Sequence, residues 1–354
     1  MKTKITLLLS GALALGILLS GCVTGLTPSS WPGISADGKT AYVASAAAVY
    51  AVNLENGNEL WRFPEKADAK KSFFAAPVLT PDGQLIVGGY DHVLYSLNPQ
   101  NGQVNWQYAE ARDHWVGSVL VTNDLIYAPN ADYNLYVLNL KGELQWKFAT
   151  RQAIWATPVT DSQRVYLGSL DRKVYAVDAR TGKLVWDKAL TGAILGSPVL
   201  GGDGRLYVAT FGGDVFALDT ANGEQLWEFS AGNFVWSAPV LSNGELYFGD
   251  SNGNFYALNA STGAKDWSLQ PSSPILGAPL VAGDHILFGT EAGNLYAVDT
   301  QGQNAWNQTL DGKLYGVPVA GSDLILVAPV EGQSLLIALD QTGTQKWAFT
   351  PVKK

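Results

Sequence analysis

The segment VYAVDARTGKLVW, residues 174–186, decides the fold because its glycine and tryptophan recur along almost the whole chain. Gly182 precedes Trp186 by four positions. Seven further pairs keep this spacing: Gly57/Trp61, Gly102/Trp106, Gly142/Trp146, Gly223/Trp227, Gly263/Trp267, Gly302/Trp306 and Gly343/Trp347. Successive tryptophans are 45, 40, 40, 41, 40, 39 and 41 residues apart. One supersecondary unit of about 40 residues is therefore repeated eight times.

Each repeat contains four short apolar runs separated by glycine, asparagine, aspartate or proline. The first two runs stand in SAPVLSNGELYFGD, residues 237–250, and the last two have the form of the segment quoted above. Runs of four or five residues rich in Val, Tyr, Leu and Phe indicate strands, and the short connections leave no room for crossover helices. The predicted fold class is all-β, an eight-bladed β-propeller of four-stranded antiparallel blades.

The repeated glycine and tryptophan have structural roles in this prediction. The glycine suits a tight turn at positive φ between the third and fourth strands. The tryptophan then lies on the outermost strand, where we expect it to be buried against the neighbouring blade. We therefore assign the eight tryptophans to blade packing and to no ligand. Eight complete sets of strands begin at Trp31, so the ring can close without exchanging a strand between the chain ends, although residues 24–30 could add an edge strand.

The N-terminus has the pattern of a bacterial lipoprotein. Lys2 and Lys4 precede a 15-residue, mainly apolar stretch at 5–19, which is too short for a comfortable membrane span and is typical of a signal peptide. The following LSGC, residues 19–22, resembles the lipobox, whose cysteine is lipidated. We predict a lipoprotein signal peptide at 1–21, a lipidated N-terminus and tether at 22–30 beginning with Cys22, and the propeller at 31–354. An ordinary signal peptide with an incidental cysteine is the alternative.

Lipidation of Cys22 would hold the protein outside the cytoplasm on a membrane surface. Val23, rather than an acidic residue, follows the cysteine. The usual sorting rule for such lipoproteins then predicts the periplasmic face of the outer membrane if the host has two membranes, and the cell surface otherwise.

Composition excludes several classes of function. The formal charge of −8 argues against nucleic acid as a partner, and a single cysteine excludes an intrachain disulfide. His92, His114 and His285 lie in different repeats without metal-ligand spacing, so no metal site is predicted. No catalytic triad or phosphate-binding glycine motif stands out, and we predict no catalytic residue. Carboxylates meeting across the channel, as in a lyase or hydrolase, remain an open alternative.

The pattern A-x-D-x-x-T-G-x-x-x-W, complete at Ala176, Asp178, Thr181, Gly182 and Trp186, resembles the tryptophan-docking motif of the pyrroloquinoline-quinone (PQQ) repeat propellers. The resemblance covers about residues 31–350. One branch, the quinoprotein dehydrogenases, implies PQQ, a calcium ion, an aspartate base and typically a disulfide of adjacent cysteines. The lone cysteine and the short chain argue against that branch. The segment DSNGN, residues 250–254, fits a turn better than a calcium loop. We therefore expect no cofactor, neither PQQ nor calcium.

A second branch resembles the chain in size, lipobox and blade number: the lipoprotein propeller of the outer-membrane β-barrel assembly machinery, the BamB type. This resemblance implies a monomeric, non-enzymatic scaffold anchored in the membrane by its lipid. Its partner would be an envelope protein such as a β-barrel assembly subunit. Two alternatives are an envelope propeller that binds or senses a ligand, and a reduced PQQ-dependent dehydrogenase-like protein.

The first strand of each blade lines the central channel, so residues just before it surround one mouth. We align these runs on their proline, with Ser118 in its place in the third repeat. Three residues earlier stand Phe74, Trp115, Trp155, Leu195, Trp236, Leu276 and Tyr315. The loops on the same face carry the basic residues Lys66, Lys70, Lys71, Arg112, His114 and Arg151. These aromatic and basic side chains form a candidate surface for an acidic or extended partner segment. The alternative is that the rings are packing and the charges are ordinary solvated groups.

Overall fold

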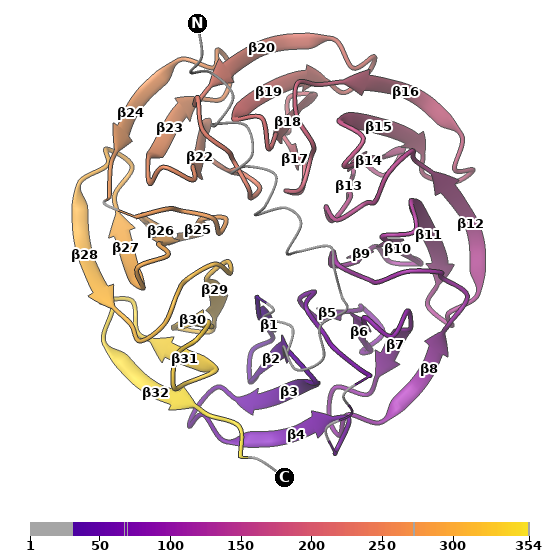
Figure 1. The fold of residues 1–354 in the computed structure, drawn as a ribbon, viewed down its shortest axis with the longest axis vertical. Coiled ribbons are helices and arrows are strands. Elements are labelled where there is room, and N and C mark those ends of the chain that lie inside the picture. The colour runs from indigo at the N-terminus through magenta and orange to yellow at the C-terminus, as the bar shows by residue number, and fades with distance from the viewer. Residues whose placement is uncertain (1–30, 67, 69, 272, 353–354) are drawn as a thin grey trace, which may run out of the picture.

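A computed structural model describes residues 31–66, 68, 70–271 and 273–352, which form a ring of eight four-stranded antiparallel sheets (Figure 1). The prediction of an all-β, eight-bladed propeller is confirmed. Among the described residues, no helix is long and apolar enough to cross a membrane. The predicted signal peptide, Cys22 and the tether up to residue 30 lie outside this range.

Every blade consists of four strands that are consecutive in the chain, with the first strand innermost and the last outermost. Blades 1 to 4 contain β1 (Gly33–Ala36), β2 (Thr40–Ser45), β3 (Ala48–Asn53), β4 (Glu59–Phe63), β5 (Val78–Leu79), β6 (Leu85–Gly88), β7 (Leu94–Leu97), β8 (Val104–Tyr108), β9 (Leu120–Val121), β10 (Leu125–Pro129), β11 (Asn134–Asn139), β12 (Leu144–Ala149), β13 (Val159–Thr160), β14 (Arg164–Gly168), β15 (Lys173–Asp178) and β16 (Leu184–Ala189). Blades 5 to 8 contain β17 (Val199–Leu200), β18 (Arg205–Ala209), β19 (Asp214–Asp219), β20 (Gln225–Ser230), β21 (Val240–Ser242), β22 (Glu245–Gly249), β23 (Phe255–Asn259), β24 (Lys265–Leu269), β25 (Leu280–Ala282), β26 (His285–Gly289), β27 (Asn294–Val298), β28 (Asn304–Thr309), β29 (Val319–Gly321), β30 (Leu324–Val327), β31 (Leu336–Leu339) and β32 (Gln345–Phe349).

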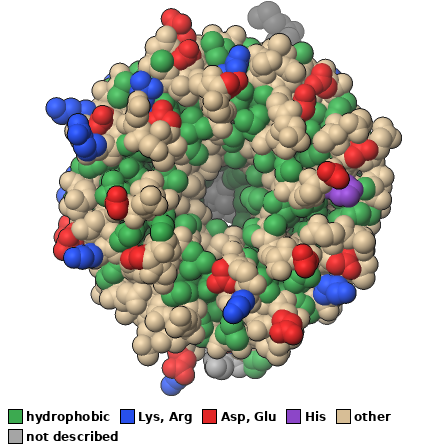
Figure 2. Space-filling view, turned by 180° about the vertical axis from the view of Figure 1, so that it is seen from behind, with side chains coloured by type: hydrophobic (Ala, Val, Ile, Leu, Met, Phe, Trp, Pro, Cys, Tyr) green, Lys and Arg blue, Asp and Glu red, His purple; other side chains and the backbone are tan. Residues whose placement is uncertain are grey.

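The two middle strands of each blade carry the core. All residues of β6 and β7 are buried, because these strands are covered on both faces by neighbouring blades, and apart from Ser96 in β7 their residues are apolar or glycine. The outermost strands instead alternate, as in β12, whose residues are exposed or half-buried. Figure 2 shows one face of the ring from behind: hydrophobic side chains gather around the central opening, and charged side chains stand mostly apart from one another.

The repeated glycine and tryptophan meet at the boundary between blades. Trp61 of blade 1 packs flat on Gly102 of blade 2, where an added Cβ would lie 2.6 Å from the indole. Gly102 has a φ of 72°, so both the turn and the contact require glycine. The same contact recurs at every boundary. Seven of the eight indoles also donate a hydrogen bond to a carbonyl of the next blade, as Trp61 does to Pro99 at 2.8 Å.

The burial of these tryptophans is less complete than the sequence predicted. Two of them, Trp61 and Trp186, are buried, each with 8% of its surface exposed. The expectation of burial is wrong for the other six, which are half-buried: Trp106, Trp146, Trp227, Trp267, Trp306 and Trp347. The physical reason is their place on the outermost strand, beyond which the blade has no further strand to cover them. One face of each indole covers the glycine of the next blade, and the rest of the ring is left partly open to solvent.

Trp146 also differs from the other docking tryptophans in its hydrogen bonding. Its ring packs on Gly182 of the next blade, where an added Cβ would lie 2.5 Å from the indole. Its indole nitrogen is nevertheless buried without a hydrogen-bond partner among the described residues. The contact with glycine, rather than the indole hydrogen bond, is therefore the feature that all eight boundaries share.

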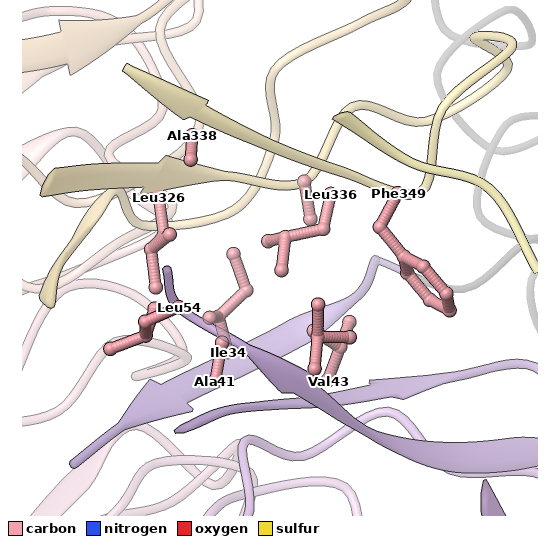
Figure 3. Close-up of a cluster of buried hydrophobic side chains, with 10 residues drawn as sticks. Ile34, Ala41, Val43, Leu54, Leu326, Leu336, Ala338 and Phe349 are labelled. Atoms are coloured by element: carbon pink, nitrogen blue, oxygen red, sulfur yellow. The ribbon is translucent and has the colours of Figure 1, made fainter. Parts of the chain in front are cut away.

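The ring closes through this same contact, between blades 8 and 1. Trp347 packs on Gly57, and its indole donates to the carbonyl of Leu54 at 2.8 Å. Below it, side chains from the two blades point toward one another in one buried cluster that includes Ile34 and Leu336 (Figure 3). Blade 1 and blade 8 each use four consecutive strands, so the prediction of closure without strand exchange is confirmed for the described residues.

Candidate binding surface at the mouth of the channel

One face of the ring is built from two kinds of loop, and we call it the mouth face. The hairpin between the second and third strands of a blade is bonded to the loop that leads from the preceding blade into that same blade. Between blades 4 and 5 the amide of Phe211 donates to Ala193 at 2.8 Å, and in blade 6 the amide of Ser251 donates to Phe234 at 2.9 Å. The repeat of these bonds fixes side chains of successive blades next to one another on this face.

Five aromatic side chains on the mouth face form a continuous cluster across the channel. Phe234 stacks on Phe211 with ring centroids 4.4 Å apart and planes 9° apart. Phe211 contacts Trp236 edge-on at 5.4 Å. Trp31 lies 5.2 Å from Trp236 and stacks on Tyr315 at 5.0 Å. This aromatic cluster therefore joins blades 5 and 6 to blades 8 and 1.

Sequence reasoning missed three members of the aromatic cluster: Trp31, Phe211 and Phe234. Trp31 immediately precedes Pro32, just before β1, a position that other blades fill with small residues or with Val317. Residues one and three positions before this proline share a face of an extended chain, because side chains alternate with a period of two. That alternation is the signal that could have placed Trp31 beside Tyr315.

The aromatic cluster is open to solvent at one end. Phe234 is 51% exposed although it is stacked on Phe211, and Val317, two residues from Tyr315 in sequence, is 45% exposed. Trp31, Trp236 and Tyr315 are half-buried. Large exposed apolar side chains that adjoin one another mark contact surfaces more often than isolated ones do. The aromatic cluster is therefore a candidate contact surface at this edge of the channel.

Trp115 does not belong to the surface, and its predicted place in the ring is wrong. Its side chain is 1% exposed within the core between blades 2 and 3. Its amide bonds the carbonyl of Gly89, just as the amide of Ile154 bonds that of Asn130 in the next blade. Trp115 is therefore equivalent to the buried Ile154, and Val119, not Ser118, stands at the proline position. The absent proline had shifted the alignment by one residue, which exchanges the two faces of an extended chain.

The two other aromatic residues of the predicted ring, Phe74 and Trp155, lie on the mouth face apart from the aromatic cluster. Phe74 is half-buried and meets Tyr90 edge-on, with ring centroids 4.0 Å apart. Trp155 is half-buried, and its indole nitrogen is buried without a hydrogen-bond partner among the described residues. Within the described chain, the predicted continuous ring is thus replaced by one cluster and separate aromatic side chains.

The predicted basic residues have different surroundings and do not form one group. Lys71 is half-buried, with its ammonium 4.9 Å from the ring centre of Tyr95, and so serves packing within blade 2. Lys70 is exposed. Arg112 and Arg151 are also exposed, and their amides donate to Asp132 and Asp171. His114 stacks on Tyr90 at 4.4 Å.

The acids of the mouth face are mostly engaged with tyrosine hydroxyls. The hydroxyl of Tyr136 donates to Asp132 at 2.6 Å, and that of Tyr315 donates to Glu291 at 2.7 Å. Burial, together with the bond to Glu291, raises the pKa of Tyr315, so this tyrosine stays protonated at neutral pH. The aromatic cluster thus offers apolar rings, with the Tyr315 hydroxyl held by Glu291.

A second group of chemically notable residues lies at the junction of blades 2 and 3. His92, Asp113 and His114 bring one ligand atom each within 4.8 Å of one another, the one such group of three or more among the described residues. The sequence predicted no metal site because these histidines stand in different repeats. Two imidazoles suit zinc and similar metals better than calcium, so this donor set does not fit the calcium of a quinoprotein.

A comparison with protein families decides the identity of the repeat. The model of the family described as "Outer membrane protein assembly factor BamB" matches residues 45–194, 170–310 and 272–352. The chain belongs to this family. Among solved structures, BamB from Moraxella catarrhalis superposes with a TM-score of 0.72 at 18% identity, covering 86% of this chain and 94% of that one. The computationally designed Ika8 protein gives a TM-score of 0.74 at 14% identity, over 93% and 98% of the two chains.

Shorter matches join this BamB-family chain to curated proteins. The human beta-alanine-activating enzyme is 32% identical over 82 residues, which are 21% of this chain and 8% of that protein. The lanthanide-dependent methanol dehydrogenase of Methylacidiphilum fumariolicum is 34% identical over 61 residues, 17% and 10% of the two chains. BamB of Burkholderia pseudomallei is 35% identical over 48 residues, 14% and 12%. The matched segments thus span about a tenth of these relatives, the size of one or two blades.

Proposed function

We propose that this protein is a non-enzymatic scaffold, anchored in a membrane through Cys22, that holds a protein of outer-membrane assembly on its mouth face. Family membership supports assembly as the setting. The lipobox at residues 19–22 supports the anchor. Trp31 follows Cys22 by nine positions, and an extended chain of that length reaches about 30 Å. The mouth face would therefore stay close to the membrane surface.

The aromatic cluster is the observation that carries this proposal. It combines an exposed anchor, Phe234, with half-buried tryptophans on a scaffold of packed blades. Aromatic anchors that are already held in place lose little conformational freedom on binding, and such residues dominate the energy of protein interfaces. We expect an extended partner segment to place apolar side chains against Phe234 and Trp31.

The proposed absence of enzymatic activity rests on the chemistry available at the mouth. Cys22 is the one cysteine of the chain, so adjacent cysteines are absent from its sequence. Tyr315 is neutral and bonded to Glu291. Adding PQQ and calcium to the purified protein should leave its unfolding temperature unchanged. A saturable rise in that temperature would favour the dehydrogenase-like alternative instead.

Capture from detergent-solubilised envelopes of the native host tests the partner. The full chain should retain a β-barrel assembly protein. Phe234→Ala combined with Trp31→Ala should reduce capture by about tenfold or more, because two aromatic contacts are lost. Leu226→Ala is the matched control, since Leu226 is 47% exposed on the outermost strand of blade 5, outside the aromatic cluster.

The possible outcomes distinguish an error in the proposed partner from an error in the proposed binding surface. If the unaltered chain captures no assembly protein, the proposed partner is wrong and a ligand-binding or sensing role becomes the better hypothesis. If the double variant captures as much as Leu226→Ala does, the scaffold stands and the aromatic cluster is packing only.

A further inference from the structure

We propose that His92, Asp113 and His114 form a binding site for a divalent transition-metal ion, with zinc as the best match. His92 comes from the hairpin between β6 and β7 in blade 2, whereas Asp113 and His114 come from the loop that leads from β8 into blade 3. The site therefore lies between two blades on the mouth face. It uses two of the three histidines of the chain.

The distances are close to those that a metal ion requires. A tetrahedral zinc ion with Zn–N distances of about 2.0–2.1 Å holds its ligand atoms about 3.4 Å apart. Nδ1 of His114 lies 3.2 Å from Oδ1 of Asp113, so one edge of the tetrahedron is already formed. The rings of His92 and His114 have centroids 5.0 Å apart. Because one ligand atom from each of the three residues lies within 4.8 Å of the others, small rotations of these half-exposed side chains would complete the site.

His114 is held in place with its ligand atom unused. Its ring stacks on Tyr90 at 4.4 Å, and Tyr90 is in turn packed against Phe74. Nδ1 of His114 is buried and makes no hydrogen bond within the described chain.

His92 is positioned by its backbone. It has a φ of 68°, in the left-handed region, at a turn position that Tyr133 and Arg172 fill with similar φ in blades 3 and 4 and that glycine fills in blades 5 to 7. The buried indole of Trp115 donates to the carbonyl of His92 at 3.0 Å and so ties this hairpin to the core. This hairpin places the imidazole of His92 beside that of His114.

The donor set indicates the kind of metal and its coordination. Two imidazoles and one carboxylate suit zinc, nickel, copper or cobalt, whereas calcium and magnesium prefer oxygen ligands alone. Three protein ligands leave one tetrahedral position for water or for a donor atom from a partner. The site is independent of the aromatic cluster, so either can fail without the other.

Zinc titration of the full chain tests the proposal. The protein is purified in detergent without a histidine tag, stripped with a chelator, and titrated against a chromophoric zinc indicator. We expect one zinc ion per chain. His92→Ala and His114→Ala should each weaken binding by about 10- to 100-fold, with a larger loss in the double variant. His285→Ala is the matched control because it removes the third histidine, in the distant β26 of blade 7, and should leave zinc affinity unchanged.

A second variant distinguishes the loss of a ligand atom from the effect of misfolding. His114→Phe keeps an aromatic ring on Tyr90 and removes only the ligand atom, so it should unfold at the same temperature as the apo protein and still lose zinc affinity. Absence of stoichiometric zinc binding to the unaltered chain would overturn the site. So would equal affinities for the unaltered chain and the His92→Ala, His114→Ala double variant.

Discussion

The junction of blades 2 and 3 and the junction of blades 5 and 6 use equivalent backbone positions for different chemistry. At the first, Tyr90 stacks on His114 with ring centroids 4.4 Å apart. At the second, Phe211 stacks on Phe234 at the same 4.4 Å. The equivalence follows from the repeated hydrogen bonds of the hairpins and loops. The propeller thus fixes where two side chains meet, and the local sequence decides what they can bind.

The residues beside these two stacked pairs also differ in chemistry. Beside the histidine stack, His92 and Asp113 add two further ligand atoms. Beside the phenylalanine stack, the equivalent positions hold Gly213 and Asn233. Trp236 then continues the apolar surface towards Trp31. One junction is therefore the proposed metal site and the other the proposed protein contact, and each can be altered separately.

The largest expected effect is a loss of folding stability when the tryptophan beside each stacked pair, Trp115 or Trp236, is replaced. Trp115→Ala should destabilise the protein by about 3–5 kcal/mol, because it empties a buried site between two blades and also removes the indole bond to His92. Trp236→Ala should cost about 1 kcal/mol, since Trp236 is half-buried at the mouth. Denaturant unfolding of both variants measures the two values. Equal losses would contradict the different placement of these tryptophans.

These tryptophans also show what sequence reasoning could and could not reach. The regular Gly-x-x-x-Trp spacing determined blade number, strand order and ring closure, because each pair is one contact repeated at every boundary. At the mouth, by contrast, deciding which residues are exposed requires an alignment of the repeats that is correct to one residue. The proline that marks this alignment in other blades is absent before β9. Without it, the sequence could not distinguish the buried Trp115 from a surface residue.

The proposed metal site and the contacts of Trp31 could not be predicted from the sequence for a related reason. His92 and His114 are 22 positions apart, and their approach depends on how a hairpin of one blade meets the loop into the next. No pattern along a single repeat contains that contact. Trp31 meets Trp236 across the channel, and such a contact exists only after the ring has closed.

Exchanging the residues of one junction for those of the other tests the difference directly. The triple variant His92→Gly, Asp113→Asn, His114→Phe gives blades 2 and 3 the residues of blades 5 and 6. Zinc at 100 times its Kd should stabilise the unaltered chain by about 2.7 kcal/mol, and this gain should vanish in the variant. Thermal unfolding with and without zinc measures both. The apo variant should remain as stable as the apo protein, because glycine relieves the φ of 68° at position 92.

The reverse exchange is sterically limited and serves as the control. A Cβ at Gly213 would lie 2.6 Å from the carbonyl oxygen of Asn233, so a histidine cannot be accommodated there without a backbone shift. Asn233→Asp with Phe234→His, made in the triple variant that lacks the His92 site, therefore supplies two ligands rather than three. Zinc stabilisation of this variant as large as that of the unaltered chain would show that His92 is not a ligand.

The smallest expected effect is a pH-dependent change in folding stability, and it follows from comparing the sheets of blades 2 and 6. In blade 2, Gln84 accepts hydrogen bonds from Ser96 and from the indole of Trp106. The equivalent residue of blade 6 is Glu245, and burial, together with the neighbouring Asp266, raises its pKa to about 7. A carboxyl group whose pKa is raised by folding favours the native state below about pH 4.5, and this contribution is lost as the pH rises through 7.

Replacing Glu245 by glutamine makes blade 6 resemble blade 2 and removes the charge. Glu245→Gln should therefore raise the unfolding temperature at pH 8 by about 1–2 °C, a value reduced for solvent screening, and have little effect at pH 4.5. Unfolding temperatures of both proteins across this range measure the difference. A gain that is the same at both pH values would mean that the glutamine improves packing and that Glu245 and Asp266 do not repel one another in the folded protein.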